Sequence, residues 1–182
     1  FGKSYYSSSL GHNVTELVLA KDLVMNYFAT SVEACTRKTH VVPLFRNEIY
    51  ERVQRGVFTD VLDKAWYMQA ASISGGSGAK PSTDSRTGQR PPQPDQDTPF
   101  IGLEQHCLLD LDDDGYAEPY IVTVEESSST VLRIVARYDR DIDIERTKDG
   151  KIISIRPIEY FTKYSFIPSP DGGIYDIGFG VL

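Results

Sequence analysis

Residues 106–138, HCLLDLDDDGYAEPYIVTVEESSSTVLRIVARY, decide the fold of this chain. Three segments within this stretch, 107–111, 119–125 and 130–137, are apolar or β-branched and predict strands. An acidic turn separates the first two strands, and a Ser-Ser-Ser turn separates the second from the third. Because short turns join antiparallel neighbours, the stretch predicts three consecutive strands of one antiparallel sheet.

Further strand signals lie on both sides of this stretch. DIDIER at 141–146 and IISIR at 152–156 flank Asp149 and Gly150, which form a preferred pair for a hairpin turn. The other segments that predict strands are 1–6, 15–19, 23–27, 37–44, 163–167 and 174–182.

Two helices are expected before the central stretch. In residues 46–55, Ile49 and Val53 stand four positions apart on one face, and Gly56 follows in the usual position after a helix end. Thr59 is expected to cap a second helix that runs to about residue 71. Helices of this length are marginal alone, so each is expected to cover a sheet.

These elements predict an α+β fold in which a β-rich antiparallel sheet carries two short helices. The chain divides into a first part, residues 1–72, a connector, 73–99, and a β-rich part, 100–182. In the connector nine of 27 residues are Pro or Gly. Such a composition buries too little apolar surface to offset its ordering entropy, so we expect a flexible insertion.

The charge is distributed unevenly along the 182 residues. Residues 1–72 carry 8 basic and 7 acidic side chains, whereas residues 100–182 carry 8 basic and 16 acidic side chains. A net charge of −8 in the C-terminal part argues against binding of nucleic acid over a wide surface. No apolar run approaches the ~20 residues that span a bilayer, so no membrane partner is expected.

The acidic turn is the strongest motif for metal chemistry. Asp110, Asp112, Asp114 and Gly115 match positions 1, 3, 5 and 6 of an EF-hand calcium loop. Position 12, which needs a bidentate Glu, is Ile121, and strands flank the turn instead of helices. These departures favour a solvated β-turn without a resident metal, and a calcium-responsive binding module stays open as the alternative.

Other catalytic arrangements find little support in the sequence. Asp112 and Asp114 lie in an exposed turn, where nothing nearby would raise the pKa of one carboxyl for acid–base work. His106 and Cys107 are neighbours in a strand and point to opposite faces, so the histidine cannot activate that thiol. Cys35 and His40 are expected to be structural. The two cysteines match no metal spacing, and a disulfide between Cys35 and Cys107 is not expected.

Two pairs of basic residues are mixed with acidic residues, which is typical of a solvated face: Arg37–Lys38 and Arg52–Arg55. From residue chemistry alone, the chain is therefore expected to be a non-enzymatic α+β domain with no catalytic, cofactor-binding or metal-binding residues.

Several blocks of the sequence, taken together and in this order, resemble the portal proteins of tailed bacteriophages. They are LVLAKDLVMNYFATSVEACTRKTH, NEIYERVQRGVFTDV, the central stretch, and IRPIEYFTKYSFIPSPDGGIYDIGFGVL. The resemblance covers most of residues 1–72 and 100–182. The blocks are similar to the wing of a portal subunit, which includes a small antiparallel SH3-like barrel.

This resemblance implies a structural, non-enzymatic subunit of a ring, typically a dodecamer, at one vertex of the virion capsid, where DNA is packaged and ejected. Capsid and scaffolding proteins would be its partners during assembly in the bacterial cytoplasm. Terminase and viral DNA would contact stem and clip regions that are expected beyond Leu182. None of the family's functional residues has a matching position in these blocks, so none is carried over.

Overall fold

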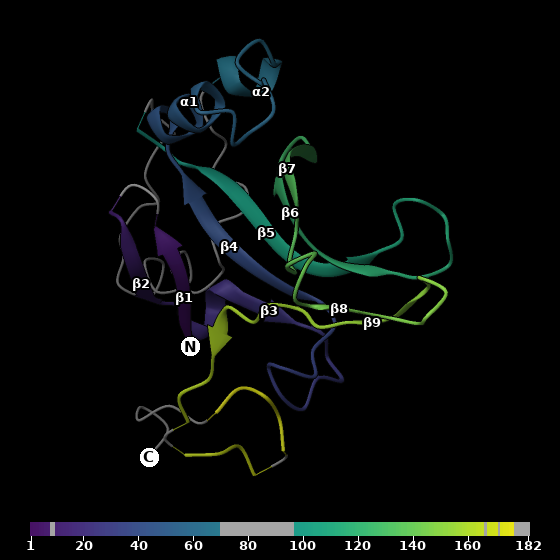
Figure 1. Ribbon diagram of the computed structural model, residues 1–182. Coiled ribbons are helices and arrows are strands. Elements are labelled where there is room, and N and C mark those ends of the chain that lie inside the picture. Colours follow the sequence, from purple (N-terminus) through teal and green to yellow (C-terminus); the bar gives the residue numbers. More distant parts are fainter. Residues whose placement is uncertain (8–9, 70–96, 166, 171, 177–182) are drawn as a thin grey trace.

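The computed structural model describes residues 1–7, 10–69, 97–165, 167–170 and 172–176. Three antiparallel sheets and two short helices make up this part of the chain (Figure 1). The α+β, β-rich class is therefore confirmed. Most of the predicted insertion, residues 73–96, lies outside the described residues.

A five-stranded antiparallel sheet in the order β3-β4-β5-β6-β7 forms the centre of the molecule. The central stretch supplies most of β5 to β7, which confirms the prediction of three consecutive strands. The strands of this sheet are β3 (Leu23–Met25), β4 (Lys38–Leu44), β5 (Phe100–Leu109), β6 (Glu118–Glu125) and β7 (Thr130–Ala136).

The start of β5 was predicted wrongly. The strand begins at Phe100 rather than at Cys107, because residues 100–106 pair along the whole of β4, from Leu44 opposite Phe100 to Lys38 opposite His106. This pairing joins the parts of the chain on either side of the connector into one sheet.

The five-stranded sheet is open. β3 and β7 are its edges, and no strand pairing among the described residues joins them. The SH3-like barrel that the resemblance implies is therefore not confirmed. Other segments contact carbonyl oxygens at both edges: the Thr59 amide donates to Leu132 and its hydroxyl donates to Val131 of β7, while the Tyr175 hydroxyl donates to Leu23 of β3.

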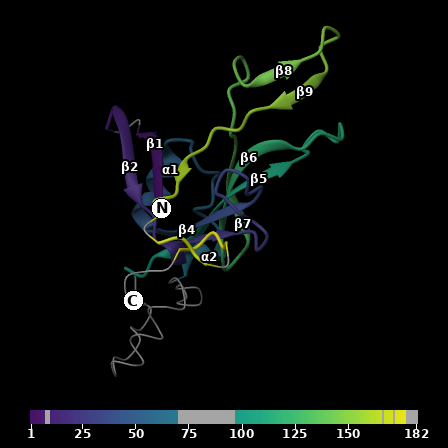
Figure 2. The ribbon, with the colours of Figure 1, turned by 90° about the horizontal axis from the view of Figure 1, so that it is seen from below.

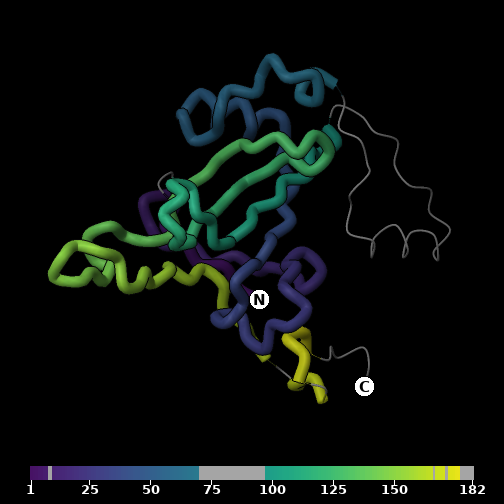
Figure 3. The backbone as a smooth tube through the Cα atoms, turned by 90° about the vertical axis from the view of Figure 1, so that its right-hand side faces the viewer, coloured from purple at the N-terminus to yellow at the C-terminus, as the bar shows by residue number. Residues whose placement is uncertain are grey.

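Two smaller sheets adjoin the central one (Figure 2). The first has the order β10-β1-β2, and the second is a hairpin of β8 and β9 that stands away from the body of the molecule (Figure 3). The predicted hairpin turn at 148–151 is confirmed, with Gly150 at φ +82°. The strands are β1 (Gly2–Ser7), β2 (His12–Leu17), β8 (Ile144–Arg146), β9 (Ile152–Ile155) and β10 (Phe161–Thr162).

The C-terminal strands differ from the prediction. β10 lies earlier than the expected strand at 163–167, because its two residues pair with Gly2 and Lys3 of β1. Residues 174–176 are described and form no strand. The rest of the predicted strand at 174–182 lies outside the described residues.

The first helix is confirmed as α1 (Arg46–Gln54), and the Glu48 carboxylate accepts a hydrogen bond from the Phe45 amide at its start. The second was predicted too long: α2 covers only Ala65–Met68. Thr59 does not cap it, because both Thr59 donors bond to β7. Within the described residues, no helix has the length and apolarity that a membrane crossing requires.

Two separate apolar clusters stabilise the fold. One lies where α1, α2 and the loop between them pack on one end of the central sheet, and its buried members are Leu44, Ile49, Phe58, Val61, Tyr67, Phe100 and Leu132. The other lies at β3, β10 and the C-terminal segment, and its buried members are Val18, Leu23, Val32, Phe161 and Ile174. A space between α1 and the β1–β2 hairpin is lined mainly by polar residues instead.

Candidate functional site

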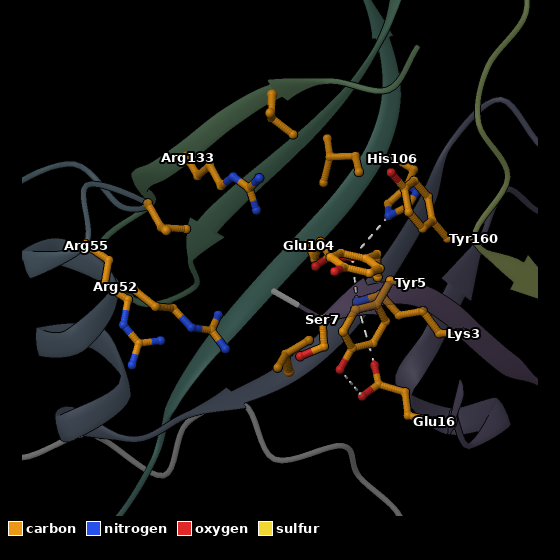
Figure 4. A pocket seen from close by; sticks show the side chains of 15 residues that line it. Lys3, Tyr5, Ser7, Glu16, Arg52, Arg55, Glu104, His106, Arg133 and Tyr160 are labelled. Atoms are coloured by element: carbon orange, nitrogen blue, oxygen red, sulfur yellow. Dashed lines mark hydrogen bonds and ion pairs between the residues drawn. The ribbon is translucent and has the colours of Figure 1, made fainter. Parts of the chain in front are cut away.

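A cleft of about 540 Å³ lies over the central sheet, between α1 and the β1–β2 hairpin (Figure 4). Aromatic and aliphatic side chains line part of it, and charged side chains come from five different elements or their ends. The charged lining residues are Lys3, Glu16, Arg52, Arg55, Glu104 and Arg133.

The alternation of side chains along the strands and the spacing on α1 explain why these charged residues face the cleft. Residues two apart on a strand share a face, so Glu104 and His106 of β5 both point toward the cleft. Lys3 of β1 faces the same space, with Glu16 opposite it in the β1–β2 register. On α1, Arg52 reaches the cleft from the other side, and Arg55 follows three residues later at the end of that helix.

At the β1 end of the cleft, ionisable side chains form what we call the Lys3 cluster: the lining residues Lys3, Glu16, Glu104 and His106, together with His40, which contacts Lys3. The Lys3 ammonium lies 2.8 Å from Glu104, 3.7 Å from Glu16 and 3.5 Å from Nδ1 of His40. Its side chain is only 12% exposed. The cluster therefore holds the three-stranded sheet against the central sheet through paired charges.

Glu104 stays ionised in this cluster. Burial alone would raise its pKa, but hydrogen bonds from His106 and Lys3, together with the charge of Lys3, lower that pKa to about 2. Such a carboxylate is a poor proton donor or acceptor near neutral pH. Glu104 therefore neutralises Lys3 and is not suited to acid–base chemistry.

His106 is fully buried, and burial lowers its pKa despite the opposing effect of Glu104. Neutral His106 then donates from Nε2 to Glu104 at 3.1 Å, so this contact is a hydrogen bond and not an ion pair. Nδ1 has no partner among the described residues. Burial likewise lowers the pKa of His40, with a further contribution from Lys3, which suits its role as acceptor of the Lys3 hydrogen bond.

The opposite end of the cleft is different. We call Arg52, Arg55 and Arg133 the arginine wall. The Arg52 guanidinium lies 5.2 Å from the ring centre of Phe58, and Arg55 pairs with Glu51 at 3.1 Å on the exposed surface. Within the described part of the chain, neither Arg52 nor Arg133 has an ion-pair partner.

A second set of buried charges lies beside His106, on the same face of the central sheet. Lys38 and Arg137 share one carboxylate, that of Glu159, at 2.5 and 2.8 Å. Lys38 was predicted to lie on a solvated face, and this prediction is wrong, because its side chain is fully buried. β4 is an inner strand, and its residue 38 lies opposite buried His106, where the segment that carries Glu159 covers the sheet.

The acidic turn is a hairpin turn between β5 and β6, as predicted. The Asp110 carboxylate accepts hydrogen bonds from the amides of Asp114 and Gly115, at 3.2 and 2.9 Å, and Asp114 accepts one from Tyr116. One carboxylate oxygen from each of Asp110, Asp112 and Asp114 lies within 4.8 Å of the others. The turn thus brings together the oxygens that the EF-hand comparison pointed to.

The cysteines and histidines do not form nucleophile–base pairs in the described residues. Both cysteines are buried, and neither forms a disulfide in the structure. The Cys35 thiol donates to the carbonyl of Arg37, while His40 contacts Lys3. Burial raises the pKa of Cys107, which disfavours the reactive thiolate.

Sequence reasoning missed Lys3, Glu104 and Arg133. No local signal marks them, because each belongs to an ordinary alternating strand and they meet only through pairing between distant segments. The Arg52–Arg55 pair was noticed but assigned to a solvated face. Arg55 is indeed exposed, whereas Arg52 is half-buried at the cleft.

Comparison with models of known protein families gives no match, and comparison with curated proteins also finds no match. The function must therefore be argued from the residues, their geometry and the blocks of sequence described above.

Proposed function

We propose that this chain is the wing part of a portal-type ring subunit, with a structural and not an enzymatic role. One observation carries the proposal: the separate blocks that resemble portal proteins meet in one folded body. The first block contains β3 and the first three residues of β4, and the second contains nearly all of α1. The third contains β6, β7 and the end of β5, and the last contains β10. The resemblance therefore concerns one structural unit and not scattered segments.

The chemistry of the cleft supports a structural role. Two of its charged residues, Lys3 and Glu104, neutralise each other and join two sheets. The side chains that bear on proton transfer are unsuited to it, since Glu104 is held ionised and burial lowers the pKa of His106. In this proposal the open five-stranded sheet corresponds to the small SH3-like barrel of the portal wing.

Exposed apolar side chains support assembly with other subunits. Tyr27 and Phe28, in the loop after β3, are 92% and 84% exposed, and their rings contact each other edge to face. Large exposed apolar groups of this kind are typical of surfaces that another protein covers. Neighbouring subunits of a homo-oligomeric ring, the capsid and scaffolding proteins are the partners that the proposal assigns, at the capsid vertex of a virion.

The charge of the chain fits a conduit for DNA better than a DNA-binding surface. The total net charge is −7. A channel surface with a net negative charge repels phosphates instead of holding them. Contacts with terminase and with DNA are assigned to other parts of the full-length subunit.

Electron microscopy of the full-length protein in negative stain tests the proposal. Rings around a central channel are expected. A uniform monomer without rings, at concentrations where portal-type subunits would assemble, would contradict a portal function.

A second candidate function is a calcium-responsive binding module, favoured by the three clustered carboxylates of the acidic turn. Calorimetric titration with calcium tests it. Binding in the micromolar range that is lost in Asp112→Asn and kept in Asp141→Asn, an exposed acidic residue elsewhere, would support this function. An absence of measurable binding would eliminate it.

A further inference from the structure

We propose that the arginine wall binds the acidic turn of a second copy of this chain. The inference rests on the proposed ring function and deepens it, because it names the two surfaces that would join neighbouring subunits. The acidic turn is here residues 110–115, and the arginine wall is Arg52, Arg55 and Arg133.

Two of the three arginines in the wall, Arg52 and Arg133, have no ion-pair partner among the described residues. The two carboxylates that share the cleft are engaged at its other end: Glu104 bonds to Lys3 and His106, and Glu16 accepts a hydrogen bond from Tyr5. In the part of the chain that the structure describes, Arg55 alone of the three has an ion pair, with Glu51, and these two side chains are 63% and 59% exposed. Because exposed pairs contribute little, Arg55 can exchange this partner for another carboxylate at small cost.

The acidic turn has the complementary properties. Its backbone is fixed by the two hydrogen bonds that the Asp110 carboxylate accepts from backbone amides. Asp113 adopts a left-handed conformation with φ +59°. The carboxylates of Asp112 and Asp113 are exposed and make no hydrogen bond or ion pair within the described residues. A preformed turn loses little conformational entropy on binding, and clustered like charges are stabilised by a cationic partner.

The two surfaces lie at opposite ends of one molecule. In Figure 1 the β5–β6 turn is at the right-hand end of the sheet, whereas α1 is at the upper left, and Figure 2 shows the same separation from below. One copy therefore cannot satisfy its own wall. A contact between two different patches of identical chains is head-to-tail, and this kind of interface closes into a ring when the rotation is suitable.

Arginine side chains suit this occupant. A guanidinium binds a carboxylate through two parallel hydrogen bonds, and three guanidinium groups face up to four aspartates in the turn. The cleft volume of about 540 Å³ falls within the ~300–1,000 Å³ of pockets that enclose small molecules, so the tip of a turn enters and a whole domain does not. A long polyanion such as DNA is disfavoured, because Glu16 and Glu104 line the same cleft.

Disulfide trapping between two variants of the 182-residue chain tests the contact. Asp113→Cys and Arg55→Cys are mixed in equal amounts at low ionic strength and oxidised, and mixed dimers are measured by mass spectrometry. The matched control replaces Arg55→Cys by Lys148→Cys, since Lys148 is also an exposed basic residue but lies in the β8–β9 turn. We expect about tenfold more mixed dimer than in the control, and less at high salt. Equal yields would overturn the inference.

Substitutions that change the charge of each surface give a second test, which introduces no cysteine. The wall variant is Arg55→Glu/Arg133→Glu, and the turn variant is Asp112→Lys/Asp113→Asn, both checked for native unfolding curves. In sedimentation at low salt, each variant alone should associate about tenfold more weakly than the native chain. Their mixture should regain association, because the native wall of the turn variant meets the native turn of the wall variant. No recovery in the mixture, or binding of a labelled DNA duplex that requires the wall arginines, would overturn the assignment.

The imaging of full-length rings separates this inference from the proposed function. Rings that form normally from the wall variant would exclude the wall–turn contact but leave the portal function intact. If the 182-residue variants form the mixed disulfide dimer but the full-length protein forms no rings, the wall–turn contact would be supported and the portal function contradicted.

Discussion

The two ends of the cleft contain similar charges that are used differently. At the β1 end, Lys3 is almost buried and has two carboxylates and a histidine around it. At the α1 end, Arg52 and Arg133 are half-buried and have no carboxylate partner in the described residues. Lys3 needs these partners, because its side chain is only 12% exposed and a buried charge without a partner costs several kcal/mol. Paired charges therefore maintain this fold, and unpaired ones remain available for a partner.

Glu104→Gln would break the paired end and have the largest effect. The substitution leaves the Lys3 ammonium without its closest carboxylate in a mostly buried position, so the free energy of unfolding should fall by about 3 kcal/mol. Urea unfolding at pH 7 measures this loss. Glu16→Gln is the matched control: it removes the more distant and more exposed carboxylate of the same lysine, and it should cost under about 1 kcal/mol.

Acid should weaken the same end of the cleft. The pKa of Glu104 in the folded protein is about 2, below the ordinary value of 4.5, so folding favours its ionised form. This contribution is complete above pH 4.5 and is lost as the pH falls toward 2. The difference in unfolding free energy between the native chain and Glu104→Gln should therefore shrink over this range. A constant difference from pH 6 to pH 3 would contradict the assigned pKa.

The histidines act in a higher pH range. Burial lowers the pKa of both His40 and His106 from 6.5, so their neutral forms are favoured by folding, and their contribution begins to decline as the pH falls below 6.5. Glu104→Gln should keep the pH dependence just below 6.5 and lose mainly the part below 4.5.

At the α1 end, Arg52→Gln should have a modest effect. Its guanidinium lies over the Phe58 ring, and a cation–π contact near the surface contributes about 0.5–1 kcal/mol. The unfolding free energy measured by urea should fall by that amount, whereas Arg52→Lys should recover part of it. A loss as large as that of Glu104→Gln would mean that Arg52 also has an internal carboxylate partner.

The smallest effect on stability is expected for Arg133→Gln. This side chain makes no ion pair with any residue that the structure describes, so the free energy of unfolding should change by less than about 0.5 kcal/mol. The same substitution should reduce the disulfide trapping between copies. If Arg133→Gln instead lowered stability by several kcal/mol, the distinction between the two ends of the cleft would no longer hold.

Local patterns predicted the parts of the fold that local interactions determine. The strands of residues 106–138, helix α1 and the Asp149–Gly150 hairpin follow from alternation, helical spacing and turn residues. The helix expected from Thr59 failed, because the Thr59 donors are needed at the edge of β7. The N-terminal seven residues of β5 were missed, because their structure depends on pairing with β4, more than 50 positions earlier in the chain.

The candidate site was less predictable than the fold. The acidic turn could be identified from spacing alone, because its four aspartates are consecutive or nearly so. In contrast, Lys3 and Glu104 are a hundred positions apart, and a lone lysine or glutamate in a strand carries no sign of its partner. Lys38 gave a misleading signal, since its neighbour Arg37 is exposed while Lys38 is covered by the segment containing Glu159.

Thr59 and Tyr175 have a consequence for how copies of this chain can associate. The edge strands of an open sheet expose unpaired backbone groups, to which a strand from another molecule can add, and such addition leads to aggregation. Here the edge carbonyls of Leu132 and Val131 are occupied by Thr59, and that of Leu23 by Tyr175. Strand-by-strand polymerisation is disfavoured at these positions, so ordered assembly is left to side-chain surfaces, which recognise a neighbour by its charge and shape.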